Sequence, residues 1–178
     1  MFRCNLETPA GARRWRHPAR DRRVAAFWLG IGLLAPLVAA AAPPRQVEAF
    51  DAGTWASWQQ GQRRPAIVVF TSTDCAHCPA ALAEIERQRR SQTPRAELRV
   101  VVMDAEPGDT ELLQHAPYRV ADRLLAFDGA ANKLRYSVNP RWIGVTPYVA
   151  LLPVGAAPTF TMGVPDASAW AGLQAAGR

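Results

Sequence analysis

The chain has 178 residues, of which 49% are hydrophobic, and its formal net charge is +6. This length corresponds to about one ordinary domain, and the apolar fraction is large enough for a packed core. Seven arginines and two acidic residues fall within residues 1–42, which leaves a net charge of only +1 on the other 136 residues. Nucleic-acid-binding domains usually present a basic face, so the nearly neutral body excludes that class of function.

Residues 1–42 have the pattern of an export segment. An arginine-rich start leads into an uncharged apolar run over 24–42, which ends in alanines before Pro43 and Pro44. This order is typical of a secretory signal peptide, and it predicts a periplasmic or otherwise exported protein. An uncleaved anchor in the inner membrane is the alternative, because nineteen apolar residues are nearly enough to span a bilayer. The membrane would then be contacted through this segment alone.

A linker and a helix are expected next. Residues 43–47 form a short Pro-rich linker, so one domain is predicted over 48–178. Asp51 is a favourable N-cap residue and Gly61 a favourable stop. Together they predict a helix over 51–60.

Residues 66–104 show the order strand, helix, strand. The runs A-I-V-V-F-T at 66–71 and L-R-V-V-V-M-D at 98–104 are mainly apolar and β-branched, as in strands that are buried on both faces. Between them, A-A-L-A-E-I-E-R-Q-R-R at 80–90 is rich in helix-forming residues. This order implies a right-handed crossover and a parallel pair of strands.

The rest of the chain is expected to add short helices and a hairpin. Helices are predicted near residues 109–116, 118–127 and 130–137, within a long segment over 105–145. A third strand is expected at 146–152 and a fourth at 158–163. Asp166 is expected to cap a last helix over 168–176.

Two of the three cysteines form the motif T-D-C-A-H-C-P at 73–79. Cys4 lies in the leader, so an exported body keeps only Cys75 and Cys78. Disulfides are permitted outside the cytosol, but a bridge across two intervening residues closes too short a loop to stabilise the fold much. A purely structural disulfide is therefore disfavoured.

Two kinds of cofactor site fit the cysteine pair poorly. Covalent haem attachment requires a histidine directly after the second cysteine, and Pro79 stands there. Structural zinc needs four ligands, whereas His77 lies within the motif and His115 is distant in sequence, so no metal site is predicted. A copper-binding or metallochaperone module stays open as the alternative function, because two thiolates suffice for a soft ion.

Redox chemistry fits the position of the motif best. Cys75 falls where a predicted strand gives way to a predicted helix, and the helix N-terminus favours the thiolate. The pKa of Cys75 is expected to fall below the free value of about 8.5. His77, when protonated, acts in the same direction. A C-x-x-C pair near a βαβ pattern is a recognised redox motif.

The sequence F-T-S-T-D-C-A-H-C-P after a buried strand resembles the active site of the thioredoxin superfamily. In the same order as in that family, G-V-T-P-Y-V at 144–149 resembles its second motif, a cis-proline before the third strand. The resemblance covers residues 48–178. It implies an α/β, thioredoxin-like fold with a central mixed β-sheet flanked by helices and a helical insertion before the cis-proline strand. Together with its export segment, the chain is similar to the periplasmic TlpA-like and DsbA-like thiol–disulfide oxidoreductases.

The resemblance also implies roles for individual residues. Cys75 would be the attacking thiolate and Cys78 would resolve the mixed disulfide, while Thr146 and Pro147 would dock the substrate chain. The implied partners are proteins with cysteines and a membrane electron donor. No organic cofactor is implied, because the cysteines themselves carry the electrons.

The direction of electron flow depends on the neighbours of the cysteines. A histidine between them, His77, stabilises the thiolate and makes the disulfide more oxidising, whereas Asp74 acts in the opposite sense. The compact size and the Thr-Pro pair resemble those of TlpA-like reductants, so the resemblance favours a reductant over an oxidant. Val69 stands where many family members bury an acid, so proton transfer is expected to involve His77, Asp74 or water. Trp142 is expected near the active face.

Overall fold

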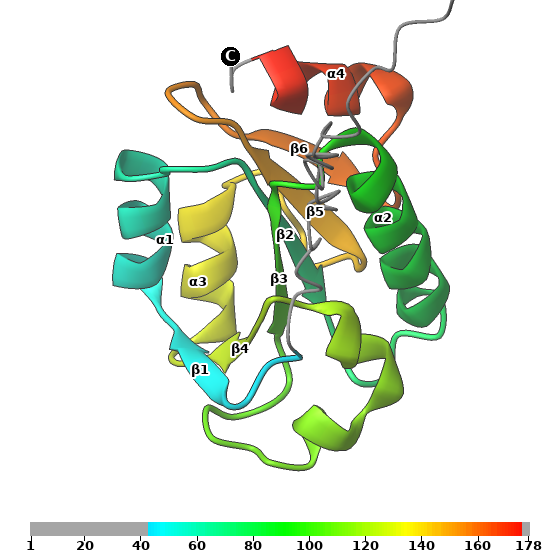
Figure 1. Ribbon diagram of the computed structural model, residues 1–178. Helices are drawn as coiled ribbons and strands as arrows, with labels where there is room; N and C mark the ends of the chain where they lie inside the picture. Colours follow the sequence, from blue (N-terminus) through cyan, green and yellow to red (C-terminus); the bar gives the residue numbers. More distant parts are fainter. Residues whose placement is uncertain (1–42, 176–178) are drawn as a thin grey trace, which may run out of the picture. The chain divides into compact units, whose positions relative to one another are not determined.

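The computed structural model describes residues 43–175, in which six strands form one mixed sheet in the order β1-β4-β3-β2-β5-β6 (Figure 1). The strands are β1 (Val47–Phe50), β2 (Ala66–Thr71), β3 (Glu97–Val102), β4 (Arg123–Phe127), β5 (Tyr148–Leu152) and β6 (Thr159–Met162). Strands β1, β4, β3 and β2 run parallel to one another, whereas β5 pairs antiparallel with β2, and β6 pairs antiparallel with β5. The expected central mixed sheet flanked by helices is confirmed.

Within residues 43–175, four α-helices and two 3-10 helices lie between or after the strands. They are α1 (Ala52–Gln60), α2 (Cys78–Gln92), α3 (Ala131–Val138) and α4 (Ala167–Ala175), with η1 (Leu112–Gln114) and η2 (Ala116–Val120). The predicted N-caps of the first and last helices are confirmed. Asp51 accepts the Thr54 N–H at 2.6 Å, and Asp166 accepts the Ala169 N–H at 2.9 Å.

The two faces of the sheet are covered differently (Figure 1). Helices α1 and α3 lie on one face and α2 and α4 on the other. The first face packs an aromatic core, which includes Phe50, Trp55, Trp58, Phe70, Phe127, Trp142 and Tyr148. The second packs a mainly aliphatic core, which includes Val69, Leu82, Ile85, Val100, Val102, Leu124 and Val149. Strands β2 and β3 are buried along their whole length, as their unbroken apolar runs predict.

The prediction of a helix near 118–127 is wrong. Residues 123–127 form β4, which pairs in parallel with both β1 and β3, and the helical segment expected over 105–145 therefore also supplies a strand of the sheet. The sequence R-L-L-A-F contains residues that favour a helix in isolation. Four of these five residues are buried inside the sheet, and this tertiary packing overrides the local preference. Ahead of it, helices η1 and η2 are short 3-10 turns, and α3 confirms the helix expected near 130–137.

The start of the domain also differs slightly from the prediction. Val47, which was expected in the linker, is buried and begins the edge strand β1. Four residues are too few for their alternation to distinguish a strand from a linker. The predicted leader over 1–42 lies outside the described residues. Within residues 43–175, no helix is long and apolar enough to cross a membrane.

Candidate active site at the start of helix α2

The cysteine pair lies between the end of β2 and the start of α2. Cys75 and Cys78 are joined by a disulfide with their Cα atoms 5.4 Å apart. The Cys78 N–H donates to the Cys75 carbonyl at 3.2 Å, and the Cys75 N–H donates to the Ser72 carbonyl at 3.3 Å. Two consecutive turns thus carry the chain from the strand into the helix. Pro79 at the first turn of α2 is compatible with this entry, because proline lacks only an N–H that would have no partner within the helix.

The two cysteines are unequally exposed. Cys78 is only 1% exposed, whereas Cys75 is half-buried. Cys75 is therefore the more accessible residue of the pair.

Asp104, just after β3, fixes the loop that precedes Cys75. Its carboxylate accepts two hydrogen bonds from the Thr73 N–H, at 2.9 Å and 3.0 Å, and one from the Thr73 hydroxyl at 2.5 Å. The Met103 N–H also donates to the Thr71 carbonyl at 2.9 Å. The ends of β2 and β3 are thereby tied together immediately before the first cysteine.

A small cavity opens beside the disulfide. Its volume is about 180 Å³, and its lining comprises Ser72, Thr73, Asp74, Cys75, Ala76, Cys78, Pro79, His115 and Tyr118. Most of these residues belong to the cysteine loop, but His115 and Tyr118 come from η2 and the residue that precedes it. The rings of His115 and Tyr118 contact each other with their centroids 4.7 Å apart. The segment between β3 and β4 therefore forms a second wall of the site.

Tyr118 keeps its proton in this environment. Burial raises the pKa of Tyr118, the negative charge of Asp104 adds to the increase, and the Thr71 hydroxyl acts in the opposite direction. The side chain is 3% exposed. Tyr118 therefore contributes a neutral phenol to the wall of the cavity.

The loop before β5 lies at the same end of the sheet. Tyr148 is paired with Phe70 in the antiparallel ladder between β5 and β2, so Pro147 lies where β2 runs into the cysteine loop. The Thr146–Pro147 peptide bond is cis. The Pro147 carbonyl accepts a hydrogen bond from the Gly163 N–H at 2.8 Å, which holds this loop against the end of β6.

Stacked aromatic side chains of the core support the same loop. Trp142 is 7% exposed and stacks on Tyr148 with the ring centroids 4.6 Å apart. Its indole N–H donates to the Val145 carbonyl at 2.9 Å. Asn139 donates to the Tyr148 hydroxyl at 2.7 Å. Trp142 thus belongs to the aromatic core and supports the segment that leads to Pro147.

The topology around the cysteines identifies the architecture. The disulfide follows a central strand of a parallel βαβ unit at the start of its helix, and Pro147 opens the antiparallel strand beside it. The described chain has a thioredoxin fold. No protein-family model and no curated protein matches the sequence.

Several solved structures are similar to this thioredoxin fold. A secreted disulfide oxidoreductase of Mycobacterium tuberculosis, homologous to E. coli DsbE, has 18% identity and a TM-score of 0.45 over 68% of this chain and 85% of that one. The N-terminal domain of PilB from Neisseria gonorrhoeae has 20% identity and a TM-score of 0.46 over 67% and 81%. A thioredoxin-like protein in its oxidised form has 14% identity and a TM-score of 0.48 over 78% and 96%.

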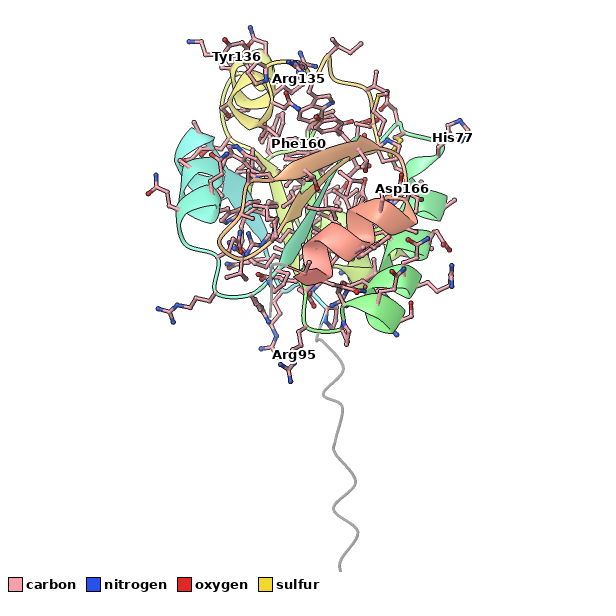
Figure 2. All side chains as sticks on the ribbon, turned by 90° about the horizontal axis from the view of Figure 1, so that it is seen from above. His77, Arg95, Arg135, Tyr136, Phe160 and Asp166 are labelled. Carbon is pink, nitrogen blue, oxygen red and sulfur yellow. A yellow bond between two sulfur atoms is a disulfide. The ribbon has the colours of Figure 1, made fainter. Side chains whose placement is uncertain are left out.

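The two charged neighbours of the cysteines are placed differently. Asp74 lines the cavity. His77 is exposed, does not line the cavity and makes no side-chain hydrogen bond at the helix N-terminus. Figure 2 shows the His77 side chain pointing away from the body of the thioredoxin domain.

Two features of this site do not follow from the sequence predictions. Asp104 was included only as the last residue of a strand, although a carboxylate at the carboxyl end of a parallel strand is well placed to reach a neighbouring loop. His115 was set aside as distant, yet it lines the same cavity as both cysteines. No local pattern could place it there, because η1 and η2 are too short to have a periodicity. In the part of the chain that the structure describes, no cluster of three or more His, Cys, Asp and Glu side chains is arranged to hold a metal ion.

Proposed function

We propose that this protein is an exported thiol–disulfide oxidoreductase that reduces disulfides in protein substrates. The observation that carries the proposal is the unequal exposure of two bonded cysteines at the start of α2, with Cys75 accessible and Cys78 buried. This is the arrangement that exchange through a mixed disulfide needs, because one sulfur meets the partner and the other attacks from within.

The reaction has two steps. The Cys75 thiolate attacks one sulfur of the substrate disulfide, forms a mixed disulfide and releases the other substrate sulfur as a thiolate. The Cys78 thiolate then attacks the Cys75 sulfur, which closes the internal disulfide and releases the second substrate thiolate. Two electrons pass to the substrate, and a separate electron donor must then reduce the Cys75–Cys78 disulfide, for which we infer a membrane protein.

The surroundings of the pair support a reductant. Asp74 shares the cavity with both cysteines, and a negative charge there disfavours the thiolate. His77, which would favour the thiolate, points away from the domain (Figure 2). Destabilising the thiolate destabilises the reduced form, which makes the pair a stronger reductant. His77 therefore has less influence than its position in the sequence indicates.

The loop before β5 supplies the surface for the substrate. Pro147 and the Thr146 backbone lie at the end of the sheet that carries the cysteine loop, and we assign them to docking of the substrate chain. Two exposed apolar residues lie close to them in the chain or in the sheet: Ile143, three residues before Thr146, is 84% exposed, and Met162, which pairs with Tyr148, is 72% exposed. Apolar groups that face solvent beside a reactive site commonly mark a contact surface. This surface fits a polypeptide segment that carries a disulfide.

Export rests on residues 1–42 and on one comparison. The basic and then apolar start of the sequence has the order of a secretory signal. One of the similar structures is a secreted protein. We infer a location where protein disulfides form, with residues 24–42 either removed or retained as a membrane anchor.

Trapping with a Cys78→Ser variant tests the proposal. Without Cys78 the mixed disulfide on Cys75 cannot be resolved, so the full chain produced with its leader in a bacterium should accumulate as covalent adducts with periplasmic proteins. The adducts should separate when dithiothreitol is added and should be absent from the matched Cys75→Ser, Cys78→Ser double variant. Failure to trap any protein would contradict exchange through Cys75.

A further inference from the structure

The reaction proposed above requires a buried thiol to lose its proton. In the reduced protein, Cys78 must become a thiolate before it can attack the Cys75 sulfur. The residue is 1% exposed, and burial in apolar surroundings disfavours a thiolate. An acidic side chain six residues before Cys75 could accept the proton, but that position is the fully buried Val69. Val69 therefore offers no group to take the proton.

The cavity provides a different path for the proton. It is lined by both cysteines and by His115, so one hollow of about 180 Å³ contacts the sulfur-bearing residues and an imidazole-bearing residue. A water molecule occupies roughly 30 Å³ in the liquid, so water can lie between these groups. His115 is itself exposed to solvent, which allows it to exchange the proton with bulk water.

The other ionisable groups at the cavity are poor candidates for a base. Tyr118 is a neutral phenol, because burial raises its pKa. Asp104, whose charge acts on Tyr118, is occupied by three hydrogen bonds from Thr73. Asp74 is a carboxylate, and carboxylates are far weaker bases than imidazole. Imidazole is the side chain that ordinarily gains and loses a proton near neutral pH.

The position of His115 is fixed by the structure around it. Its ring contacts the buried ring of Tyr118, with centroids 4.7 Å apart. Helix η2, which carries Tyr118, packs against α2, the helix that begins at Cys78. Asp122, just beyond η2, accepts the Leu98 N–H at 2.7 Å and lies 3.5 Å from the Arg89 guanidinium of α2. The imidazole is therefore held at the cavity by its contact with Tyr118, whose helix η2 packs against the helix that carries Cys78.

We propose that His115 accepts the proton of the Cys78 thiol, through water in the cavity, during resolution of the mixed disulfide. The inference rests on the function proposed above. The Cys78 S–H bond breaks and its proton passes to the imidazole, while the resulting thiolate attacks the Cys75 sulfur. The bond between Cys75 and the substrate sulfur breaks, and the leaving thiolate takes up the proton that the imidazolium gives back, directly or through solvent. His115 starts and ends the cycle neutral, and no further reactant is needed.

The experiment compares His115→Gln with the matched control His77→Gln in the full-length reduced protein. Each protein is mixed with oxidised glutathione, the reaction is stopped with acid at intervals, and the glutathione adduct on Cys75 is quantified by mass spectrometry. Decay of this adduct reports the attack by Cys78. We expect His115→Gln to slow the decay about tenfold to a hundredfold near neutral pH, as for loss of a general base. The two variants should converge at alkaline pH, well above the free-thiol value of about 8.5, where the buried Cys78 thiol ionises without a base.

A control variant and a rescue experiment distinguish proton transfer by His115 from a purely structural role of this residue. His77→Gln should decay at the wild-type rate at every pH. Added imidazole should restore the rate of His115→Ala, because the cavity is open to solvent. Equal decay in wild type and His115→Gln, or slowing by the same factor at every pH, would overturn the role of His115 and leave disulfide exchange intact. Failure of the wild-type protein to form any glutathione adduct would overturn the proposed function itself.

Discussion

The two walls of the active-site cavity are built in different ways. The first wall is the loop over 72–79, which two local turns and the start of α2 hold in place. The second wall is the segment over 104–122, which has only two short 3-10 helices and is held in place by tertiary contacts, including the buried Leu112 and Tyr118. Asp104 binds Thr73 at one end, and Asp122 meets Arg89 of α2 at the other. The first wall carries the sulfurs, and in our account the second carries the proton acceptor.

This difference separates two kinds of functional residue. The position of a cysteine at a strand-to-helix junction is a local property, so changes in the first wall should act on bond formation directly. The position of His115 depends on tertiary contacts at both ends of its segment, so changes far from the cavity should reach it. Substitutions in each wall can distinguish direct effects on the cysteines from effects that reach His115 through tertiary contacts.

Cys75→Ser should have the largest effect. Removal of the attacking sulfur leaves only the buried Cys78 at the site, so single-turnover reduction of oxidised glutathione by the fully reduced protein should fall to the uncatalysed rate. The free energy of unfolding of the reduced protein should change little, because Cys75 is half-buried and near the surface. Turnover is followed by the appearance of reduced glutathione. Residual catalysis in this variant would mean that the intact Cys78 can attack the substrate, which would contradict the separate roles of the two cysteines.

Glu86→Gln should have the next largest effect and should act on the second wall from α2. Glu86 accepts hydrogen bonds from the Arg89 guanidinium at 2.6 Å and 3.0 Å, and both side chains are buried. The substitution leaves the Arg89 charge with only Asp122 nearby and should cost about 2 kcal/mol of unfolding free energy. Urea titration measures this loss.

The same variant predicts a dependence on pH. Burial tends to raise the pKa of Glu86, but the hydrogen bonds from Arg89 and Arg90 outweigh it, and the pKa of the folded state is lowered. A lowered folded-state pKa contributes stability above the unfolded value of about 4.3, and this contribution is lost as the pH falls through the folded-state value. The difference between wild type and Glu86→Gln should therefore shrink below about pH 4. A difference that stayed constant on acidification would contradict the ionic role of Glu86.

Asp104→Asn should have the smallest effect on stability, at about 1 kcal/mol, because the hydrogen bonds it weakens are exposed to solvent. Its effect on exchange should be more visible than its effect on unfolding, since it releases the loop before Cys75 and the start of the second wall together. The comparison is with Thr73→Ala, which removes one of the same hydrogen bonds without changing charge. If both variants exchange glutathione at the wild-type rate, the link between the two walls has no role in the reaction.

The sequence was informative wherever the structure is determined locally. The unbroken apolar runs of β2 and β3, the caps at Asp51 and Asp166, and the cysteine pair at the start of a helix could all be predicted from short stretches. Strand β4 could not be predicted in this way, because R-L-L-A-F also suits a helix. Only its burial between β1 and β3 determines that it is a strand. His115 could not be placed at the cavity, because its position depends on Tyr118 and Asp122.

The reduction potential of the Cys75–Cys78 pair in the full-length protein tests the central claim most directly. The protein is equilibrated with mixtures of reduced and oxidised glutathione, and the fraction of the internal disulfide is quantified after acid quenching. We predict reversible equilibration with a potential near that of thioredoxin, roughly −270 mV, because Asp74 shares the cavity and His77 points away from it. A pair that does not equilibrate, or one with a potential near −120 mV as in strong oxidants, would contradict the account of this protein as a disulfide reductant.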